Sequence, residues 1–288
     1  MILQAALPAA LAFIMFAMGL TMAPGDIGRV FRQPKALVAG LAAKLLLVPL
    51  AGLAVVSLWR LPSDFAVGLI LLAACPAGVT SALLSHLAGG RIALAAAITA
   101  LTSLAAAVTV PLLVNLGLTV FAGYDRSVEI PVGRMILGIF LVDTVPLALG
   151  LAVQHVWPRL ADRSGRVARP IATLLFAAIV VGAFVGQRQA LMDHLGDVVP
   201  AALALNLLAM AGAWALGGAC RLDLADRIAV VMENGLQNGA LGIFVAVTLL
   251  GNPAMMVPSI VYAFVMNLTA LAFIGAVRRR RELIPTSE

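Results

Sequence analysis

The sequence predicts an all-α polytopic membrane protein with about nine transmembrane helices, built as inverted repeats with two discontinuous crossing helices, the third and the eighth. Of its 288 residues, 62% are hydrophobic and only 11% are charged. A soluble domain carries about 25% charged residues. So few charges cannot cover a water-soluble surface, so we expect the lipid bilayer to be the main solvent. Apolar runs of membrane-spanning length and two interrupted runs complete the prediction.

Apolar runs long enough to cross a bilayer recur along the whole chain. We place the spans at roughly Leu3–Leu20, Ala36–Trp59, Phe65–Leu87, Ile92–Leu116, Ile136–Val156, Pro170–Val185, Val198–Ala219, Ile228–Leu250 and Met255–Val277. The connections between them are too short to hold a soluble domain, so the chain is predicted to be one membrane domain. Its two cysteines, Cys75 and Cys220, have no metal-ligand spacing, which argues against a zinc site or a disulfide.

Basic residues gather on one side of the predicted spans. One set of alternate loops and the C-terminal tail hold 14 Lys and Arg residues, and the opposite loops hold 4. The 14 are Arg29, Arg32, Lys35, Arg91, Arg159, Arg163, Arg166, Arg169, Arg221, Arg227 and Arg278–Arg281. The positive-inside rule then places the N-terminus outside and the C-terminus in the cytoplasm. We expect a multi-pass protein of a bacterial inner membrane, and this charge placement argues against nucleic acid as a partner.

Two of the apolar runs are interrupted. The third contains ACPAGVTS at residues 74–81, and the eighth contains ENGLQNGALG at residues 233–242. Such backbone survives at membrane depth only where protein or a water-filled cavity surrounds it. Because the two runs are five spans apart, they lie at corresponding positions of halves with inverted topology, which points to a transporter's binding site. The predicted substrate residues are Pro76, Gly78, Thr80, Ser81, Asn234, Gly235, Asn238 and, in the ninth span, Asn267.

The alternative for the third run is a proline kink with a small-residue packing face. For Asn267, as for Asn206, the alternative is a structural role in hydrogen bonds between helices. Packing does not explain Glu233 beside Gln237 in the eighth run, so a functional role is favoured there.

Three ionisable residues lie well inside spans: Lys44, Asp143 and Glu233. Each costs about 2.5–3.5 kcal/mol at a helix centre, so function is the default interpretation. Lys44 and Glu233 enter from the same side, and their depths are compatible with contact. Lys44 snorkelling to the headgroups is the alternative. Asp143 has two structural alternatives, lining a crevice or capping the turn before Pro146.

Four stretches of the sequence resemble the bile acid:sodium symporter family. They are IMFAMGLT at residues 14–21, ACPAG at 74–78, ENGLQNGALG at 233–242 and VMN at 265–267. They occur in the family's order and span nearly the whole chain.

The resemblance implies two groups of helices that alternate access to an organic anion bound between them. The implied parts are panel helix 1 (1–30), core helices 2–4 (36–117), panel helices 5–6 (131–190), core helices 7–9 (195–278) and a cytoplasmic tail (279–288). We expect a monomer whose partners are the bilayer and a small organic anion.

The resemblance also implies sodium sites behind the crossing helices, and here the sequence departs from it. Oxygen-bearing side chains remain at the matching positions Ser81, Thr99, Glu233 and Gln237. Two other matching positions are Ala82 and Ala95, which have no side-chain oxygen, and the position of a family Gln is Lys44. Because an ammonium repels sodium, we predict that Lys44 replaces the ion by pairing with Glu233. Transport would then be sodium-independent or proton-coupled, with no cofactor.

Three rival functions remain open. Arsenite-efflux relatives use a Cys and a Glu in the two broken helices, as Cys75 and Glu233 would allow. A non-transporting membrane sensor is a second rival. An intramembrane enzyme is disfavoured, because no metal or acid/base motif is present and the three histidines are scattered. The substrate itself stays open among bile acids, keto acids, pantoate-like acids and sulfated steroids.

Overall fold

The computed structural model describes residues 2–22, 28, 30–31, 34–78, 80–121 and 132–282. Within these residues the chain forms helices and no strand. The elements are α1 (Ile2–Gly19), α3 (Pro34–Ala42), η1 (Ala43–Leu47), α4 (Val48–Leu58), α5 (Ser63–Ala74), α6 (Ser81–Leu87), α7 (Ile92–Phe121), α8 (Val132–Ile139), η2 (Phe140–Thr144), α9 (Val145–Val156), α10 (Pro158–Gly186), α11 (Arg188–Asp193), α12 (Leu195–Ala219), α13 (Leu224–Gly235), α14 (Gly239–Phe244), η3 (Val245–Leu249), η4 (Pro253–Met256) and α15 (Val257–Glu282). The all-helical prediction is confirmed.

Six helices among the described residues are long and apolar enough to cross a membrane on their own. They are Pro34–Leu58, Ile92–Phe121, Val132–Val156, Pro158–Gly186, Leu195–Ala219 and Pro253–Arg279. The first, third and eighth predicted spans correspond to shorter apolar helices. The multi-pass membrane architecture follows from this set.

The predicted bounds of the sixth span were wrong. The sequence predicted Pro170–Val185, whereas α10 begins twelve residues earlier, at Pro158. Proline suits the first turn of a helix, where its missing N–H is not needed. The arginines that follow it, such as Arg159 and Arg163, are exposed. A polar first half therefore extends the helix beyond its apolar part.

Both predicted interruptions are confirmed. The third span divides into α5 and α6, and its extended part contains Cys75 at the end of α5. The eighth divides at Leu236 into α13 and α14. Ala77 and Gln237 pair as an isolated antiparallel bridge, so the two extended segments cross. We call these paired segments, residues 75–78 and 236–238, the crossover.

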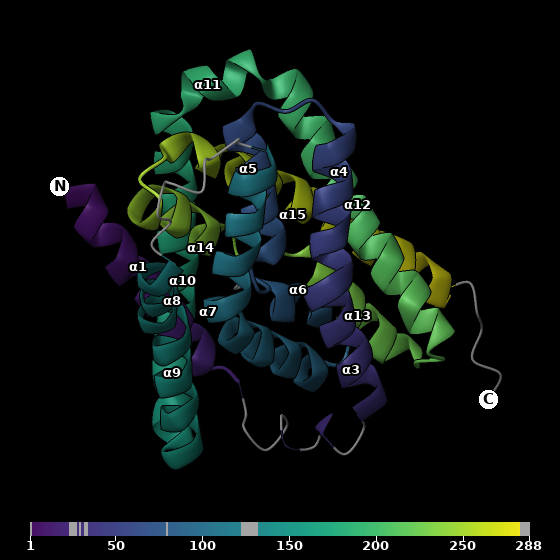
Figure 1. Cartoon of the computed structure of the whole chain (residues 1–288). Coiled ribbons are helices and arrows are strands. Elements are labelled where there is room, and N and C mark those ends of the chain that lie inside the picture. The colour runs from purple at the N-terminus through teal and green to yellow at the C-terminus, as the bar shows by residue number, and fades with distance from the viewer. Residues whose placement is uncertain are drawn as a thin grey trace.

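Two sets of helices pack closely among themselves. α1 packs mainly against α9 and α10, which lie together on the left of Figure 1. α12 packs against α4, α13 and α15, towards the right. We use "panel" for α1, α8–η2–α9 and α10, and "core" for α3–α7 and α12–α15; this division remains a proposal.

Two spans contain a π-helical turn that carries an ionisable residue. Lys44 lies in η1 and Asp143 lies in η2. A proline follows each turn, Pro49 in α4 and Pro146 in α9. Proline removes a backbone donor and clashes with the preceding turn, which is a common cause of a local change in helical winding. Such π-turns occur often at functional sites.

Some predicted features lie outside the described residues. These include the loop residues Arg29, Arg32 and Arg126, Val79 of the third span, and residues 283–288 of the tail. The side chains of Arg280 and Arg281 are also outside them.

Candidate functional site

The crossover is held by backbone hydrogen bonds between the two broken spans. The Asn238 amide donates to the Pro76 carbonyl at 2.9 Å, and the Gly78 amide donates to the Leu236 carbonyl at 3.3 Å. A Cβ added at Gly78 would lie 2.9 Å from the Gln237 carbonyl oxygen. Gly78 is therefore required by the close approach of the two backbones. The crossover is buried protein rather than lipid-exposed backbone, as this depth demands.

Lys44 is the cation behind the crossover. Its side chain is 3% exposed. Its ammonium donates to the side-chain oxygen of Gln237 at 2.6 Å and to the backbone carbonyl of Glu233 at 3.0 Å. Snorkelling to the headgroups does not describe this side chain, because it points into protein.

The contact between Lys44 and Glu233 differs in form from the predicted pair. The ammonium bonds to the carbonyl of Glu233, and no ion pair joins it to a carboxylate within the described part of the chain. The Glu233 carboxylate instead accepts a hydrogen bond from Thr99 through Oε2. It still lies close enough to Lys44 for a charge interaction, and the Ser81 hydroxyl is also within its reach.

The residues behind the crossover do not fit a sodium ion. Sodium is a hard cation that needs several oxygen ligands. Gln237 Oε1, one of the remaining oxygens, is taken by the Lys44 ammonium. Ala82 and Ala95 provide no side-chain oxygen. One oxygen of Glu233, Oε1, has no hydrogen-bond partner among the described residues, but the nearby ammonium already supplies positive charge.

Asn206 and Tyr262 support the crossover from the core. The side-chain nitrogen of Asn206 donates to the Gly235 carbonyl at 2.8 Å, and the Tyr262 hydroxyl donates to the same carbonyl at 2.9 Å. Asn206 also bonds to the Tyr262 hydroxyl at 3.1 Å. They satisfy a carbonyl freed where α13 ends. Tyr262 is not among the site residues predicted from the sequence, although an isolated tyrosine in an apolar span is a signal for one.

The other predicted asparagines have separate roles. Asn238 caps α14 by accepting from the Leu241 amide at 3.1 Å. Asn234 bonds one turn back to the Val230 carbonyl at 2.7 Å. Asn267 does the same to Ala263 in α15 at 2.6 Å, so it is not bonded to the crossover.

A cavity of about 250 Å³ lies between panel helices α1 and α10 and core helices α6 and α7. Its polar lining comes from Thr21, Thr80, His86, Arg169 and Thr173. Ala82 also lines it, and no Asp or Glu does. An arginine, a histidine and three hydroxyls suit an anion.

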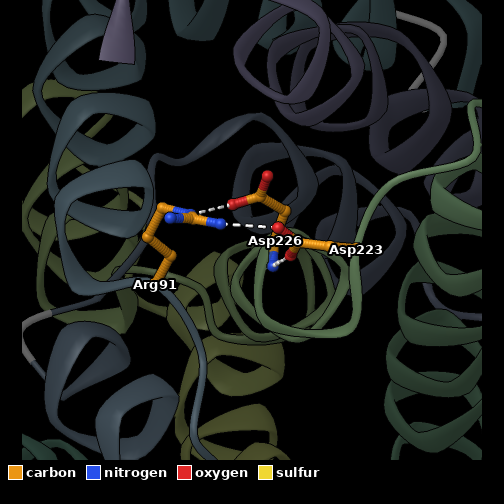
Figure 2. A network of polar contacts seen from close by, with 3 residues as sticks. All are labelled: Arg91, Asp223 and Asp226. Carbon is orange, nitrogen blue, oxygen red and sulfur yellow. Dashed lines mark hydrogen bonds and ion pairs between the residues drawn. The ribbon is translucent and has the colours of Figure 1, made fainter. Parts of the chain in front are cut away.

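A salt-bridge network ties the fourth span to the second broken span at one end of the core. The Arg91 guanidinium bonds to Asp223 at 2.6 Å and also to Asp226, as Figure 2 shows. The Arg91 amide donates to the Ala225 carbonyl at 3.1 Å. The hydrogen bond to Asp226 is the main cause of a raised Arg91 pKa. The network therefore joins the start of α7 to the start of α13.

Two broken helices with crossing, buried centres and charged residues beside them are the arrangement that marks the substrate and ion sites of polytopic secondary transporters. The chain belongs to the Sodium Bile acid symporter family, whose family model matches residues 8–194. Members of this family are transporters rather than enzymes.

Several curated proteins are similar to most of the chain. "Probable sodium/metabolite cotransporter BASS2, chloroplastic" of Oryza sativa subsp. japonica is 28% identical over 280 residues, covering 96% of this chain and 64% of the relative. "Uncharacterized sodium-dependent transporter YocS" of Bacillus subtilis (strain 168) is 28% identical over 263 residues, covering 90% and 78%. The human "P3 protein" is 26% identical over 217 residues, covering 74% and 44%. The chain spans less than two thirds of the rice and human relatives.

Proposed function

We propose that this chain carries a small organic anion by alternating access, and that Lys44 takes the place of a sodium ion, so that transport does not require sodium. The observation that carries the proposal is the buried Lys44 ammonium bonded to Gln237 and to the Glu233 carbonyl. The proposal places the protein in a bacterial inner membrane with its N-terminus outside and its C-terminus in the cytoplasm, as the loop arginines favour.

A tethered ammonium has two electrostatic consequences. It provides the positive charge that the buried Glu233 carboxylate needs, since an isolated buried charge is very costly. It also opposes a second cation. Two unit charges roughly 4 Å apart repel by about 4 kcal/mol at an effective dielectric constant of about 20, which corresponds to about a thousandfold loss in affinity.

The cavity argues for a small substrate. Sites for drug-sized ligands occupy about 300–1,000 Å³, and this cavity measures about 250 Å³. A keto acid or a pantoate-like carboxylate suits that volume better than a bulky steroid. Arg169 is the side chain best suited to the carboxylate, because its planar guanidinium can donate two parallel hydrogen bonds.

A thermal-shift screen of the purified protein tests the substrate class. We expect small carboxylates to raise the melting temperature and a bile acid to leave it unchanged. Arg169→Ala should remove the shift, whereas the exposed Arg163→Ala should retain it. Stabilisation by the bile acid alone, or a full shift in Arg169→Ala, would contradict this assignment.

Sodium-coupled transport is the second candidate. It is favoured by the names of two relatives, a "Probable sodium/metabolite cotransporter" and an "Uncharacterized sodium-dependent transporter". The two candidates differ in one measurable property, the dependence of uptake on sodium.

A further inference from the structure

Asp143 is a buried carboxyl group that the crossover network does not use. It lies in η2 and is 0% exposed. Neither of its carboxyl oxygens has a hydrogen-bond partner among the described residues, and neither does the buried Ser103 hydroxyl of α7. Asp143 and Ser103 are close enough to interact. Two buried polar groups therefore lie close to each other, but their geometry falls short of the well-formed hydrogen bond that burial normally requires.

The neighbouring residue fixes this contact between panel and core. The Thr144 hydroxyl donates to the Ser103 carbonyl at 3.1 Å. η2 packs against both α7 and α1. We call the contact of Asp143 and Thr144 with Ser103 the seam. If panel and core move during transport, the seam is a place where they separate.

No charged partner faces Asp143 from the elements packed on η2. α1 and α7 contain no ionisable residue at all. On its own span, Arg134 and His155 are nine and twelve residues away. The titratable group that interacts electrostatically with Asp143 is the Cys75 thiol of the crossover, which also interacts with Lys44. Cys75 itself donates to the Leu71 carbonyl at 3.3 Å.

A cation other than a proton finds too few ligands here. The seam offers the two oxygens of Asp143 and the hydroxyl of Ser103, and the Thr144 hydroxyl is engaged with a carbonyl. No group of three or more His, Cys, Asp and Glu side chains that could hold a metal occurs among the described residues. A buried carboxylate with no counter-ion becomes neutral by taking up a proton.

We propose that Asp143 binds a proton at the seam and that the seam must hold this proton to close. The protonated carboxyl donates to the Ser103 hydroxyl. When panel and core separate, water reaches Asp143, the O–H bond breaks, the proton passes to water and the carboxylate is hydrated. Closing the seam reverses these steps. This inference rests on the proposed alternating access and adds a pH-sensitive residue to it.

Infrared spectroscopy tests the protonation without any transport assay. A protonated carboxylic acid has a carbonyl stretch that is distinct from that of a carboxylate. Purified wild type at neutral pH should show this band, and Asp143→Asn should lose it. Asp162→Asn, which changes an exposed carboxylate, is the matched control and should keep it. Glu233→Gln should also keep it. An unchanged band in Asp143→Asn would overturn the inference, even if transport proved sodium-independent.

The pH profile of uptake tests the consequence. Asparagine resembles the protonated acid in shape but cannot release a proton. We expect the wild-type rate of uptake of the anion found in the ligand screen to change with pH, by at most about tenfold per pH unit for one titrating group. The rate for Asp143→Asn should not change with pH. Asp162→Asn should follow the wild-type profile. A lower rate in Asp143→Asn with an unaltered pH profile would indicate a purely structural residue and would overturn the inference.

Discussion

The ammonium of Lys44 lies 2.6 Å from the side-chain oxygen of Gln237, 193 residues further along the chain. This hydrogen bond joins the second span to the second broken helix. Gln237 in turn donates to the Asn234 carbonyl at 2.9 Å. Lys44 therefore stabilises the backbone of the crossover, and its charge also balances that of the Glu233 carboxylate.

Removing the Lys44 charge should destabilise the protein. Lys44→Met keeps much of the side-chain volume but leaves Gln237 Oε1 and the Glu233 carbonyl without a donor. Loss of one partner from a buried charged network costs about 3–5 kcal/mol, so the melting temperature should fall clearly. Exposed Lys35→Met is the control, with an expected change within about 0.5 kcal/mol. Equal melting of Lys44→Met and wild type would argue that Lys44 is not structurally coupled to the crossover.

Lys44→Gln should behave differently from Lys44→Met. Glutamine supplies an amide donor to Gln237 and an oxygen for a cation, and it removes the repelling charge. We expect part of the lost stability to return, and sodium to raise the melting temperature of this variant alone. A sodium effect of equal size in wild type would contradict this prediction.

Glu233→Ala should abolish uptake of the transported anion in proteoliposomes while the protein still folds. The substitution removes the carboxylate that accepts from Thr99 and leaves the Lys44 charge without its counter-charge. Thr99→Val removes only the hydrogen bond and should reduce uptake less. Wild-type rates in Glu233→Ala would show that the carboxylate is not part of the transport site.

Gly78→Ala should disrupt the crossover. A methyl group there would lie 2.9 Å from the Gln237 carbonyl oxygen, and that oxygen is backbone and cannot easily move away. Such overpacking costs about 1–3 kcal/mol, so both stability and uptake should fall. Gly182→Ala is the matched control, because a methyl group there meets no atom within 4 Å. Similar behaviour of the two variants would rule out the close approach at Gly78.

The orientation can be tested with single cysteines in a background without Cys75 and Cys220. Gln189 in α11 and Ser164 in α10 are both exposed and lie at opposite ends of the sixth span. An impermeant reagent on whole cells should label Gln189→Cys and not Ser164→Cys. The same result is expected for Gln4→Cys outside and Ser287→Cys inside. The reverse pattern would invert the topology.

The crossover could be predicted because its causes are local. Proline, glycine and polar residues inside apolar runs are visible in one sequence, and their spacing gave both broken spans. The charges at Lys44 and Glu233 were also visible, because any ionisable residue stands out in an apolar helix. Their contact was predicted from depth, but the acceptor atom was not.

The remaining features depend on packing between distant segments. The π-turns around Lys44 and Asp143 need coordinates, although Pro49 and Pro146 were partial signals. Tyr262 meets Asn206 only because α12 and α15 pack together. The hydrogen bonds of Arg91 with Asp223 and Asp226 join residues that are more than 130 positions apart in the sequence. The loop charges predict that Arg91 lies on the cytoplasmic side of the membrane, but they do not identify the residues with which it pairs.

The most direct test of the central claim is initial uptake of the anion found in the ligand screen, measured in proteoliposomes at fixed pH with sodium or choline as the external cation. If Lys44 replaces the sodium ion, wild-type rates should be equal in the two buffers, and only Lys44→Gln should gain a sodium response. A steep, saturable dependence of wild-type uptake on sodium would contradict the replacement and support sodium-coupled transport instead.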